Sequence, residues 1–174
     1  AEIFDPATGT FAPTGSLTTE RVAHSATLLA DGRVLVTGGS NRYGEPRTAE
    51  LYDPASGRFE RAGAAAGGHL FAVPQRDGRV LVLGGTPPEI WAPVAPVEAP
   101  KPGHVPGPGF SVAEPPVANR QGHTATLLAD GRVLVAGGMT QDLSDGNPPD
   151  VLRSAEVFDP ASGSLELVYN DPKA

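Results

Sequence analysis

The sequence contains no cysteine, which excludes disulfide bonds, thiolate metal sites and cysteine nucleophiles from this stretch of chain. Lysine is nearly absent as well: Lys101 and Lys173 are the only two. Acidic residues outnumber Lys and Arg by 20 to 13, which gives a net charge of −7. Because binding to nucleic-acid phosphates depends on clustered basic side chains, we expect no nucleic-acid partner.

Long apolar runs are also missing. No stretch approaches 18 consecutive apolar residues, so we expect no membrane span. Turn-forming residues are plentiful instead, with 22 Gly and 19 Pro among 174 residues. This composition predicts a backbone that changes direction often and has few long helices. The length is sufficient for one domain with its own hydrophobic core.

The chain contains internal repeats. The sequence ATLLADGRVLV occurs at 26–36 and again at 125–135, and a looser copy, FAVPQRDGRVLV, fills 71–82. Each copy runs directly into a pair of glycines. A second motif alternates with the first, and its copies are AEIFDPATGTF at 1–11, AELYDPASGRF at 49–59, the degenerate EIWAP at 89–93 and AEVFDPASGSL at 155–165.

Each repeat contains four segments of strand length. In the first full repeat they are HSATLL (24–29), RVLVTGG (33–39), AELYD (49–53) and RFERAG (58–63), named segments a to d here. Asp-Gly separates a from b, and Asp-Pro-Ala-Ser-Gly separates c from d; both are strong turn signals. Each repeat is therefore predicted to fold as a four-stranded antiparallel meander.

A meander cannot bury both of its faces alone, so neighbouring repeats must stack. Four strands that recur every ~40–50 residues are typical of a β-propeller blade. We predict an all-β chain, a single partial propeller over 1–174, with a c–d half-blade at 2–13 and blades at 21–63, 67–115 and 120–168. Because closed propellers have ~4–8 blades, we expect these three and a half blades to belong to a larger propeller whose other blades are missing here.

The order of Arg-x-x-His, a strand, an Asp-Gly turn, a strand ending in Gly-Gly and two later aromatic residues resembles the kelch repeat. The residues that carry this resemblance are Arg21, His24, Gly38, Gly39 and Tyr52 in the first repeat, His69, Gly84, Gly85 and Trp91 in the second, and Arg120, His123, Gly137, Gly138 and Phe158 in the third. The second repeat departs from the pattern with Ala66 in place of the Arg. Kelch repeats usually have Trp in segment d, where Phe11, Phe59, Phe110 and Leu165 stand here.

The resemblance is to the bacterial kelch type, in the superfamily of the galactose oxidase central domain. It implies that the repeated residues are structural and that the protein is located outside a bacterial cell or on its surface. The paired glycines are expected to allow close backbone packing within and between blades. The repeated histidines are expected to bond to a backbone neighbour, and Arg21 and Arg120 to anchor hydrogen bonds between blades.

A metal site formed by the three repeated histidines is the alternative to a structural role. Each of these histidines belongs to a different blade, which places them too far apart for metal bonds of ~2 Å. The segment DLSDGNPPD (142–150) offers oxygen ligands for Ca²⁺ but lacks the EF-hand spacing. We expect no metal ion and no other cofactor.

Residues 94–109 depart from the repeat and are rich in proline, which supplies no backbone donors for strand pairing. They interrupt the second repeat between segments c and d, so we expect a surface insertion at the outer rim. The alternative is a proline-rich ligand for an aromatic groove on another protein.

Variable loops on a rigid scaffold are where binding is expected. In a meander, the a–b and c–d turns lie on one face, and the more variable b–c and d–a connections lie on the other. The candidate ligand-binding residues are Asn41, Arg42, Tyr43 and Arg47 in the first b–c loop, and Gln141, Asp142, Asp145 and Asn147 in the third.

The leading hypothesis is a non-catalytic propeller scaffold that binds a protein or a carbohydrate. One alternative is the propeller part of a galactose oxidase-like or other secreted carbohydrate-active enzyme, whose catalytic residues lie outside this chain. The copper site of galactose oxidase includes a Cys–Tyr crosslink that cannot form here. Another alternative is an inert structural array. A nucleotide loop at VLVTGGSNRYG (34–44) is not expected, because another strand instead of a helix follows the glycines.

Overall fold

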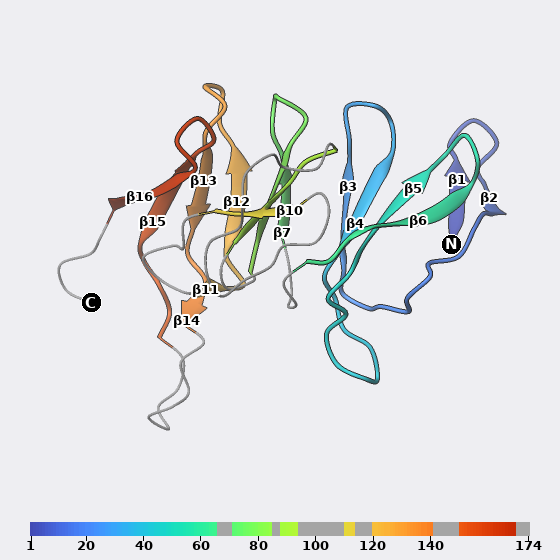
Figure 1. Cartoon of the computed structure of the whole chain (residues 1–174), viewed down its shortest axis with the longest axis horizontal. Coiled ribbons are helices and arrows are strands. Elements are labelled where there is room, and N and C mark those ends of the chain that lie inside the picture. Colours follow the sequence, from blue (N-terminus) through green and yellow to red (C-terminus); the bar gives the residue numbers. More distant parts are fainter. Residues whose placement is uncertain (66–70, 85–87, 94–109, 114–119, 141–149, 170–174) are drawn as a thin grey trace.

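The computed structural model describes residues 1–65, 71–84, 88–93, 110–113, 120–140 and 150–169 (Figure 1). Every regular element within these residues is a β-strand, and the described part of the chain contains no helix. The all-β class expected from the repeated strand-length segments is therefore confirmed for the described residues.

The strands form three four-stranded antiparallel sheets, named sheets I, II and III here. Sheet I contains β3 (Ser25–Leu28), β4 (Val34–Thr37), β5 (Ala49–Asp53) and β6 (Arg58–Gly63). Sheet II contains β7 (Phe71–Pro74), β8 (Val80–Leu83), β9 (Glu89–Trp91) and β10 (Phe110–Val112). Sheet III contains β12 (Thr124–Leu127), β13 (Val133–Ala136), β15 (Ala155–Asp159) and β16 (Ser164–Tyr169). In each sheet the strands follow one another in chain order, as a meander requires.

Two smaller pairings accompany these sheets. The hairpin of β1 (Glu2–Asp5) and β2 (Thr10–Pro13) has the sequence of segments c and d. The pair of β11 (Arg120–Gln121) and β14 (Met139–Thr140) adds a short two-stranded sheet beyond the paired glycines of the third repeat. An isolated bridge between Val22 and Ser40 is its counterpart in the first repeat. The β1–β2 hairpin was predicted from the sequence, whereas the β11–β14 pair and the Val22–Ser40 bridge were not.

The turns have the local chemistry that the sequence indicates. In the first a–b turn, Asp31 accepts two hydrogen bonds from Arg33. The backbone N–H donates to Oδ1 at 3.0 Å, and the side-chain Nε–H donates to Oδ2 at 2.8 Å. The same pair of hydrogen bonds recurs between Asp77 and Arg79 and between Asp130 and Arg132. Gly32, between Asp31 and Arg33, has φ +87°, a conformation that glycine adopts without steric cost.

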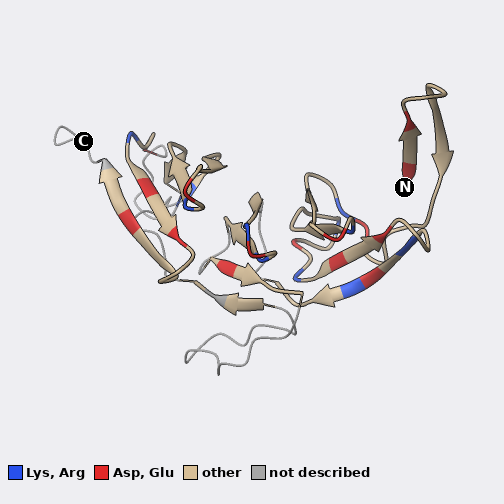
Figure 2. Cartoon of the chain, turned by 90° about the horizontal axis from the view of Figure 1, so that it is seen from above, with Lys and Arg blue, Asp and Glu red and all other residues tan. Residues whose placement is uncertain are grey.

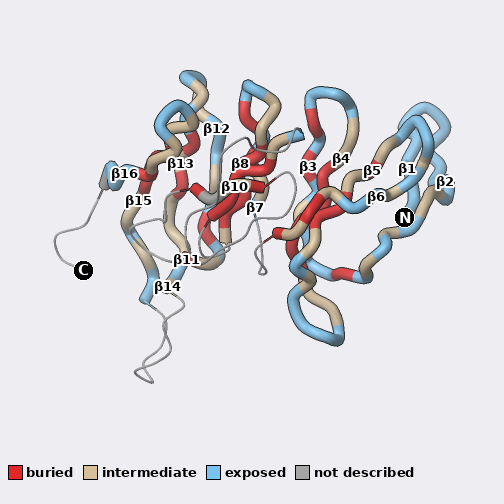
Figure 3. Tube along the Cα trace, viewed as in Figure 1, coloured by how far each residue is buried: buried red, intermediate tan, exposed pale blue. Residues whose placement is uncertain are grey.

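The hydrophobic core lies between sheets rather than within one of them. In the first cluster, Leu35, Leu51 and Ala49 of sheet I pack against residues of sheet II, namely Val80, Val82, Trp91 and Phe110. In the second, Leu81, Leu83 and Ile90 of sheet II pack against residues of sheet III, namely Val133, Val135, Phe158 and Leu165. Alternate residues of β8 therefore serve two interfaces, and the whole strand is buried (Figure 3).

The three sheets lie side by side along an open arc, with the β1–β2 hairpin at one end (Figure 2). Strand β3 contacts β7, and β7 contacts β12, so the first strands of the repeats lie next to one another. This arrangement is compatible with the blades of a propeller. The described strands do not close into a ring.

The paired glycines allow a close backbone approach at the end of the second strand. Gly39 has φ +84°, and a Cβ atom placed there would lie 2.4 Å from the carbonyl oxygen of Val22. Gly138 has φ +89°, and its Cβ would lie 2.6 Å from the carbonyl oxygen of Gln121. In both cases the two backbone segments belong to the same repeat. These two glycines therefore allow close packing within a blade, and the expected role in packing between blades is not observed for them. Gly85 lies outside the described residues, and Gly84 has φ +101°.

The Gly39→Ala substitution is expected to lower the free energy of unfolding by clearly more than Gly32→Ala. Both positions have a positive φ, which costs an alanine about 1–2 kcal/mol, but only at Gly39 would the new Cβ collide with a backbone carbonyl. Urea unfolding followed by circular dichroism measures both variants. Equal losses in the two variants would contradict the close-approach role.

Candidate functional site

A buried arginine holds the base of the first b–c loop. Arg21 Nη1 donates to the carbonyl oxygens of Gly38 at 2.9 Å and Thr48 at 3.0 Å. Its Nη2 donates to Thr48 Oγ1 at 3.0 Å and to Glu50 Oε1 at 3.1 Å. The Arg21–Glu50 ion pair is excluded from solvent on both sides. Arg21 therefore fastens the end of β4 to the start of β5, the two points between which the loop leaves the sheet.

The Glu50 carboxylate also fixes the segment that precedes β3. It accepts the backbone N–H of Thr18 at 2.6 Å and that of Thr19 at 3.1 Å. Burial by itself raises the pKa of Glu50, but these amides and the Arg21 guanidinium outweigh it and hold the pKa below its usual value. The carboxylate is therefore kept charged by two backbone amides and the guanidinium.

The third repeat contains an equivalent arginine–glutamate pair. Arg120 donates to the carbonyl oxygens of Gly137 at 2.9 Å and Ser154 at 3.1 Å, and it pairs with the buried Glu156. The repeated arginines therefore anchor bonds within their own repeats, and the expectation of bonds between blades is wrong. The physical reason is that the partner carbonyls and carboxylate lie at the base of the arginine's own b–c loop.

Sequence analysis missed the glutamates of these clusters. Glu50, Glu89 and Glu156 occupy the same position in the third strand of each sheet, and all three are buried. The signal was present, because the dipeptide Ala-Glu opens the second repeat motif in three of its four copies. A glutamate that recurs at the same position of a predicted strand is a candidate for burial. In a sequence with repeated arginines, it is also a candidate for a buried ion pair, because a buried charge needs a partner.

The two repeated histidines that the structure describes have different surroundings. His123 is 3% exposed, and its Nδ1 lies 3.1 Å from the carbonyl oxygen of Arg120, while its ring packs 4.7 Å from that of Phe71 in sheet II. His24 is exposed, and His69 lies outside the described residues. Within the described residues, no group of three His, Asp or Glu side chains could hold a metal ion.

The first b–c loop presents an ordered polar and aromatic surface. The Asn41 and Gly44 backbones bond to each other in both directions, at 2.8 and 3.1 Å, and Asn41 Oδ1 accepts the N–H of Tyr43 at 2.8 Å. Asn41 Nδ2 donates to the carbonyl oxygen of Glu20 at 3.0 Å. The Tyr43 side chain is 82% exposed, and the Arg42 guanidinium lies 4.9 Å from its ring centroid.

Arg42 adds an ion pair to this surface, with its Nε 3.0 Å from Glu20 Oε1. The surface formed by Glu20, Asn41, Arg42 and Tyr43 is named the Tyr43 patch here. Arg47 is exposed further along the loop, and its carbonyl oxygen accepts the N–H of Ala65 at 3.3 Å. The other predicted ligand residues, Gln141, Asp142, Asp145 and Asn147, lie outside the described residues.

The loop between β4 and β5, which carries Tyr43, and β14 lie on the face of the arc opposite the a–b turns (Figure 1). This is the arrangement predicted for a row of meanders, in which the b–c connections share one face. In the third repeat, Met139 of β14 bridges to Val151, and Thr140 N–H donates to the carbonyl oxygen of Asp150 at 2.9 Å. The backbone at the base of each of these two loops is therefore hydrogen-bonded to a neighbouring strand or bridge.

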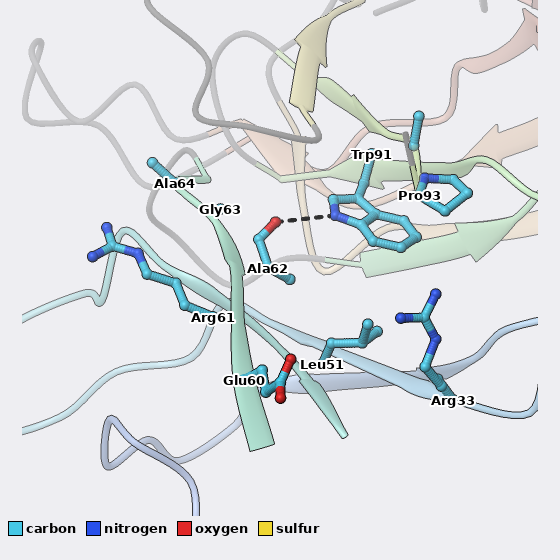
Figure 4. A pocket seen from close by; sticks show the side chains of 10 residues that line it. Arg33, Leu51, Glu60, Arg61, Ala62, Gly63, Ala64, Trp91 and Pro93 are labelled. Carbon is cyan, nitrogen blue, oxygen red and sulfur yellow. Dashed lines mark hydrogen bonds between the residues drawn. The ribbon is translucent and has the colours of Figure 1, made fainter. Parts of the chain in front are cut away.

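A groove of about 570 Å³ lies between sheets I and II at the outer strands (Figure 4). Arg33, Glu60 and Arg61 line one side, and Trp91 and Pro93 line the other. The Trp91 side chain is 3% exposed, and its Nε1 donates to the carbonyl oxygen of Ala62 at 3.2 Å, so it is committed to the sheet interface. Arg33 is likewise held by Asp31, with Nη2 2.7 Å from the Asp31 carboxylate.

No family model matches the sequence, and no curated protein matches it. In the described part of the chain, no helix is present that could cross a membrane.

The polar groups described above are of two kinds, buried and exposed. The buried carboxylates of Glu50 and Glu156 are bonded within the scaffold, whereas the Tyr43 patch offers an exposed ring beside an acid–base pair, which suits binding.

The Arg21→Met substitution is expected to lower the free energy of unfolding by about 3–5 kcal/mol, because it leaves the buried Glu50 carboxylate without its cation. The matched control is Arg33→Met, which breaks a partly exposed pair with Asp31 and is expected to cost about 0–1 kcal/mol. Chemical denaturation measures both. Similar losses for the two variants would show that the buried pair does not hold the loop base.

Burial lowers the pKa of His123 below its usual 6.5. Below about pH 6.5 the unfolded chain takes up this proton more readily than the folded chain, so the free energy of unfolding is expected to fall as the pH is lowered. The His123→Phe substitution is expected to flatten this slope between pH 7.5 and about 5.5. Thermal melts across this range test the expectation, which is wrong if the variant keeps the slope.

The lowered pKa of Glu50 acts in a more acidic range. Its contribution to stability is complete above the usual Glu pKa of 4.5 and is lost as the pH falls through the lower folded value. Glu50→Gln is therefore expected to reduce the loss of stability below pH 4.5 while lowering the stability at neutral pH. An unchanged acid slope in this variant would contradict a charged Glu50 in the folded state.

Proposed function

We propose that this chain is part of a non-catalytic kelch-type β-propeller that binds a protein or a carbohydrate through its b–c and d–a face. Support for the propeller comes from three stacked four-stranded meanders in an arc, each built from the same sequence motifs. Support for the kelch type comes from the recurring Arg, His and Gly-Gly positions. Further blades would complete the ring, and the resemblance also suggests a location outside a bacterial cell or on its surface.

The observation that carries the binding proposal is the Tyr43 patch. Its aromatic ring is almost fully exposed, yet the backbone beneath it is fixed by bonds from Asn41 and Gly44. Tyrosine offers a large contact area at a low cost in side-chain entropy, and aromatic and Arg side chains are enriched among residues that dominate binding energy. A ring held in place before binding loses less entropy on contact with a ligand.

The alternating charges around the ring add selectivity. Arg42 lies 4.9 Å from the Tyr43 ring centroid and pairs with Glu20, and both charged side chains are exposed. Such a surface can stack on a sugar ring or on an apolar peptide side chain and can hydrogen-bond to polar groups at its rim. It contains no nucleophile next to a general base, so the proposal is binding and not catalysis.

The test is binding of the chain to immobilised panels of bacterial and plant polysaccharides and of peptides. For a binding panel member, the double substitution Arg42→Ala and Tyr43→Ala is expected to weaken the affinity at least tenfold, as the loss of a binding hot spot does. The matched control is Arg132→Ala, which removes a similarly exposed ion pair from the opposite face. Binding to sugars or to peptides decides the ligand class.

Two results would contradict this proposal. Retention of affinity by the double variant would remove the Tyr43 patch from the binding surface. Failure to bind any panel member, with the chain folded by circular dichroism, would favour an inert structural array.

A further inference from the structure

The a–b turns contain a dipeptide with a chemistry of its own. In an Asp-Gly pair, the glycine nitrogen can attack Cγ of the aspartate and close a five-membered succinimide ring, because glycine has no side chain to hinder the approach. The carboxyl hydroxyl group and the N–H proton leave as water. Water then opens the ring at either carbonyl. Opening at the main-chain carbonyl leaves isoaspartate, whose main chain runs through the side-chain carbon and is one atom longer.

The chain contains four Asp-Gly pairs, and three of them form the a–b turns. An arginine follows each of these three pairs directly, whereas Asn147 follows the fourth pair, at 145–146, which lies outside the described residues. The aspartate side chains of the three turns are about half exposed, so burial does not keep water from them. The three turns are Asp31-Gly32-Arg33, Asp77-Gly78-Arg79 and Asp130-Gly131-Arg132.

The arginine keeps the carboxylate of the first turn ionised. Arg33 Nε donates to Asp31 Oδ2 at 2.8 Å, and Arg33 Nη2 lies 2.7 Å from the same oxygen. The side chain and the backbone N–H of Arg33 together lower the pKa of Asp31. An ionised carboxylate is a weak electrophile, because its charge repels the attacking nitrogen and it has no hydroxyl group to lose as water. The ion pair therefore depletes the form of Asp31 that reacts.

The other two turns hold their carboxylates in the same way. Arg79 Nε donates to Asp77 Oδ2 at 2.7 Å, and Arg132 Nε donates to Asp130 Oδ2 at 2.8 Å. Burial by itself raises the pKa of Asp77, but the bonds from Arg79 outweigh it and lower the pKa. The Arg132 side chain likewise lowers the pKa of Asp130.

The attacking nitrogen is also restrained. Gly32 N–H donates to the carbonyl oxygen of Leu29 at 3.0 Å. The equivalent bonds of the second and third turns are 3.2 and 3.0 Å long. The nitrogen has to lose this proton when it attacks, and a hydrogen-bonded amide loses its proton more slowly than a free one. Each turn therefore holds both reacting groups in their unreactive forms.

We propose that the three a–b turns are latent isoaspartate sites, and that the arginine of each Asp-Gly-Arg turn keeps its site unreacted. Isoaspartate at position 31 would lengthen the main chain inside the turn that sets the pairing of Leu28 with Val34. The arginine thus preserves the covalent geometry that the meander needs. The inference does not depend on the Tyr43 patch or on any ligand, so the proposed function and this inference can fail separately.

The test is prolonged incubation of the full chain at mildly acidic pH, where the carboxyl groups of an unfolded chain begin to be protonated. Peptide mapping with electron-transfer fragmentation then distinguishes isoaspartate from aspartate, which has the same mass. A synthetic peptide of residues 27–36 is the reference, because it has the same sequence without the folded turn. Isoaspartate is expected to form at position 31 of the chain at least about tenfold more slowly than in the peptide.

The Arg33→Met variant isolates the contribution of the ion pair. The rate at Asp31 is expected to rise about fivefold or more, while the rates at Asp77 and Asp130 stay within about twofold of those in the unsubstituted chain. These two turns are internal controls, because a general loss of folding would raise all three rates. The matched variant Arg132→Met is expected to move the increase to Asp130.

Hydrogen exchange at the Gly32 amide separates the ion pair from the backbone of the turn, and it is expected to stay unchanged in Arg33→Met. A faster exchange at Gly32 that accompanies the rise at Asp31 would assign the effect to a loosened turn and overturn the role of the arginine. An unchanged rate at Asp31 in this variant would overturn it as well. Formation of isoaspartate in the unsubstituted turns at the rate of the peptide would overturn the whole inference.

Discussion

The structure depends on a buried arginine–glutamate pair at the base of each b–c loop for which it describes both partners. Charges removed from water are stable only when the surrounding groups satisfy them, and one partner without the other is costly. Within the described residues, Arg21 and Glu50 meet this condition at every polar side-chain atom except Arg21 Nε, with bonds to two carbonyls, a hydroxyl and two amides. Three backbone segments, 18–21, 38–39 and 48–50, therefore have to meet at one point, and Gly39 has to be a glycine for the chain to come close enough.

The binding surface that we propose follows from this constraint. The loop that carries Tyr43 begins and ends beside the Arg21–Glu50 pair, so its two ends are fixed before the turn at Asn41 and Gly44 orders its tip. In the third repeat, Arg120 and Glu156 hold the equivalent loop base, next to β11 and β14. A rigid base with a variable tip is the arrangement in which loops change ligands without changing the fold.

The sequence was sufficient to predict the strands, their order and their turns, because Asp-Gly-Arg and Asp-Pro-Ala-Ser-Gly determine their own geometry locally. It was not sufficient for the direction of the Arg21 bonds, since that depends on where Thr48 and Glu50 lie after folding. The glutamates were visible as a repeated Ala-Glu pair, but a charged residue is buried only when it is paired, and the sequence does not show the pairing. The groove between sheets I and II could not be found from sequence, because it arises from how two sheets are spaced.

The measurement that tests the account most directly is hydrogen exchange at the Thr18 and Thr19 amides. These residues lie in a connection between strands, where amides normally exchange fast, but their N–H groups donate to the buried Glu50 carboxylate. We expect protection comparable to that of β4 and β5, and loss of this protection in Arg21→Met. Exchange at the rate of an unstructured chain would contradict the claim that this ion pair organises the repeat.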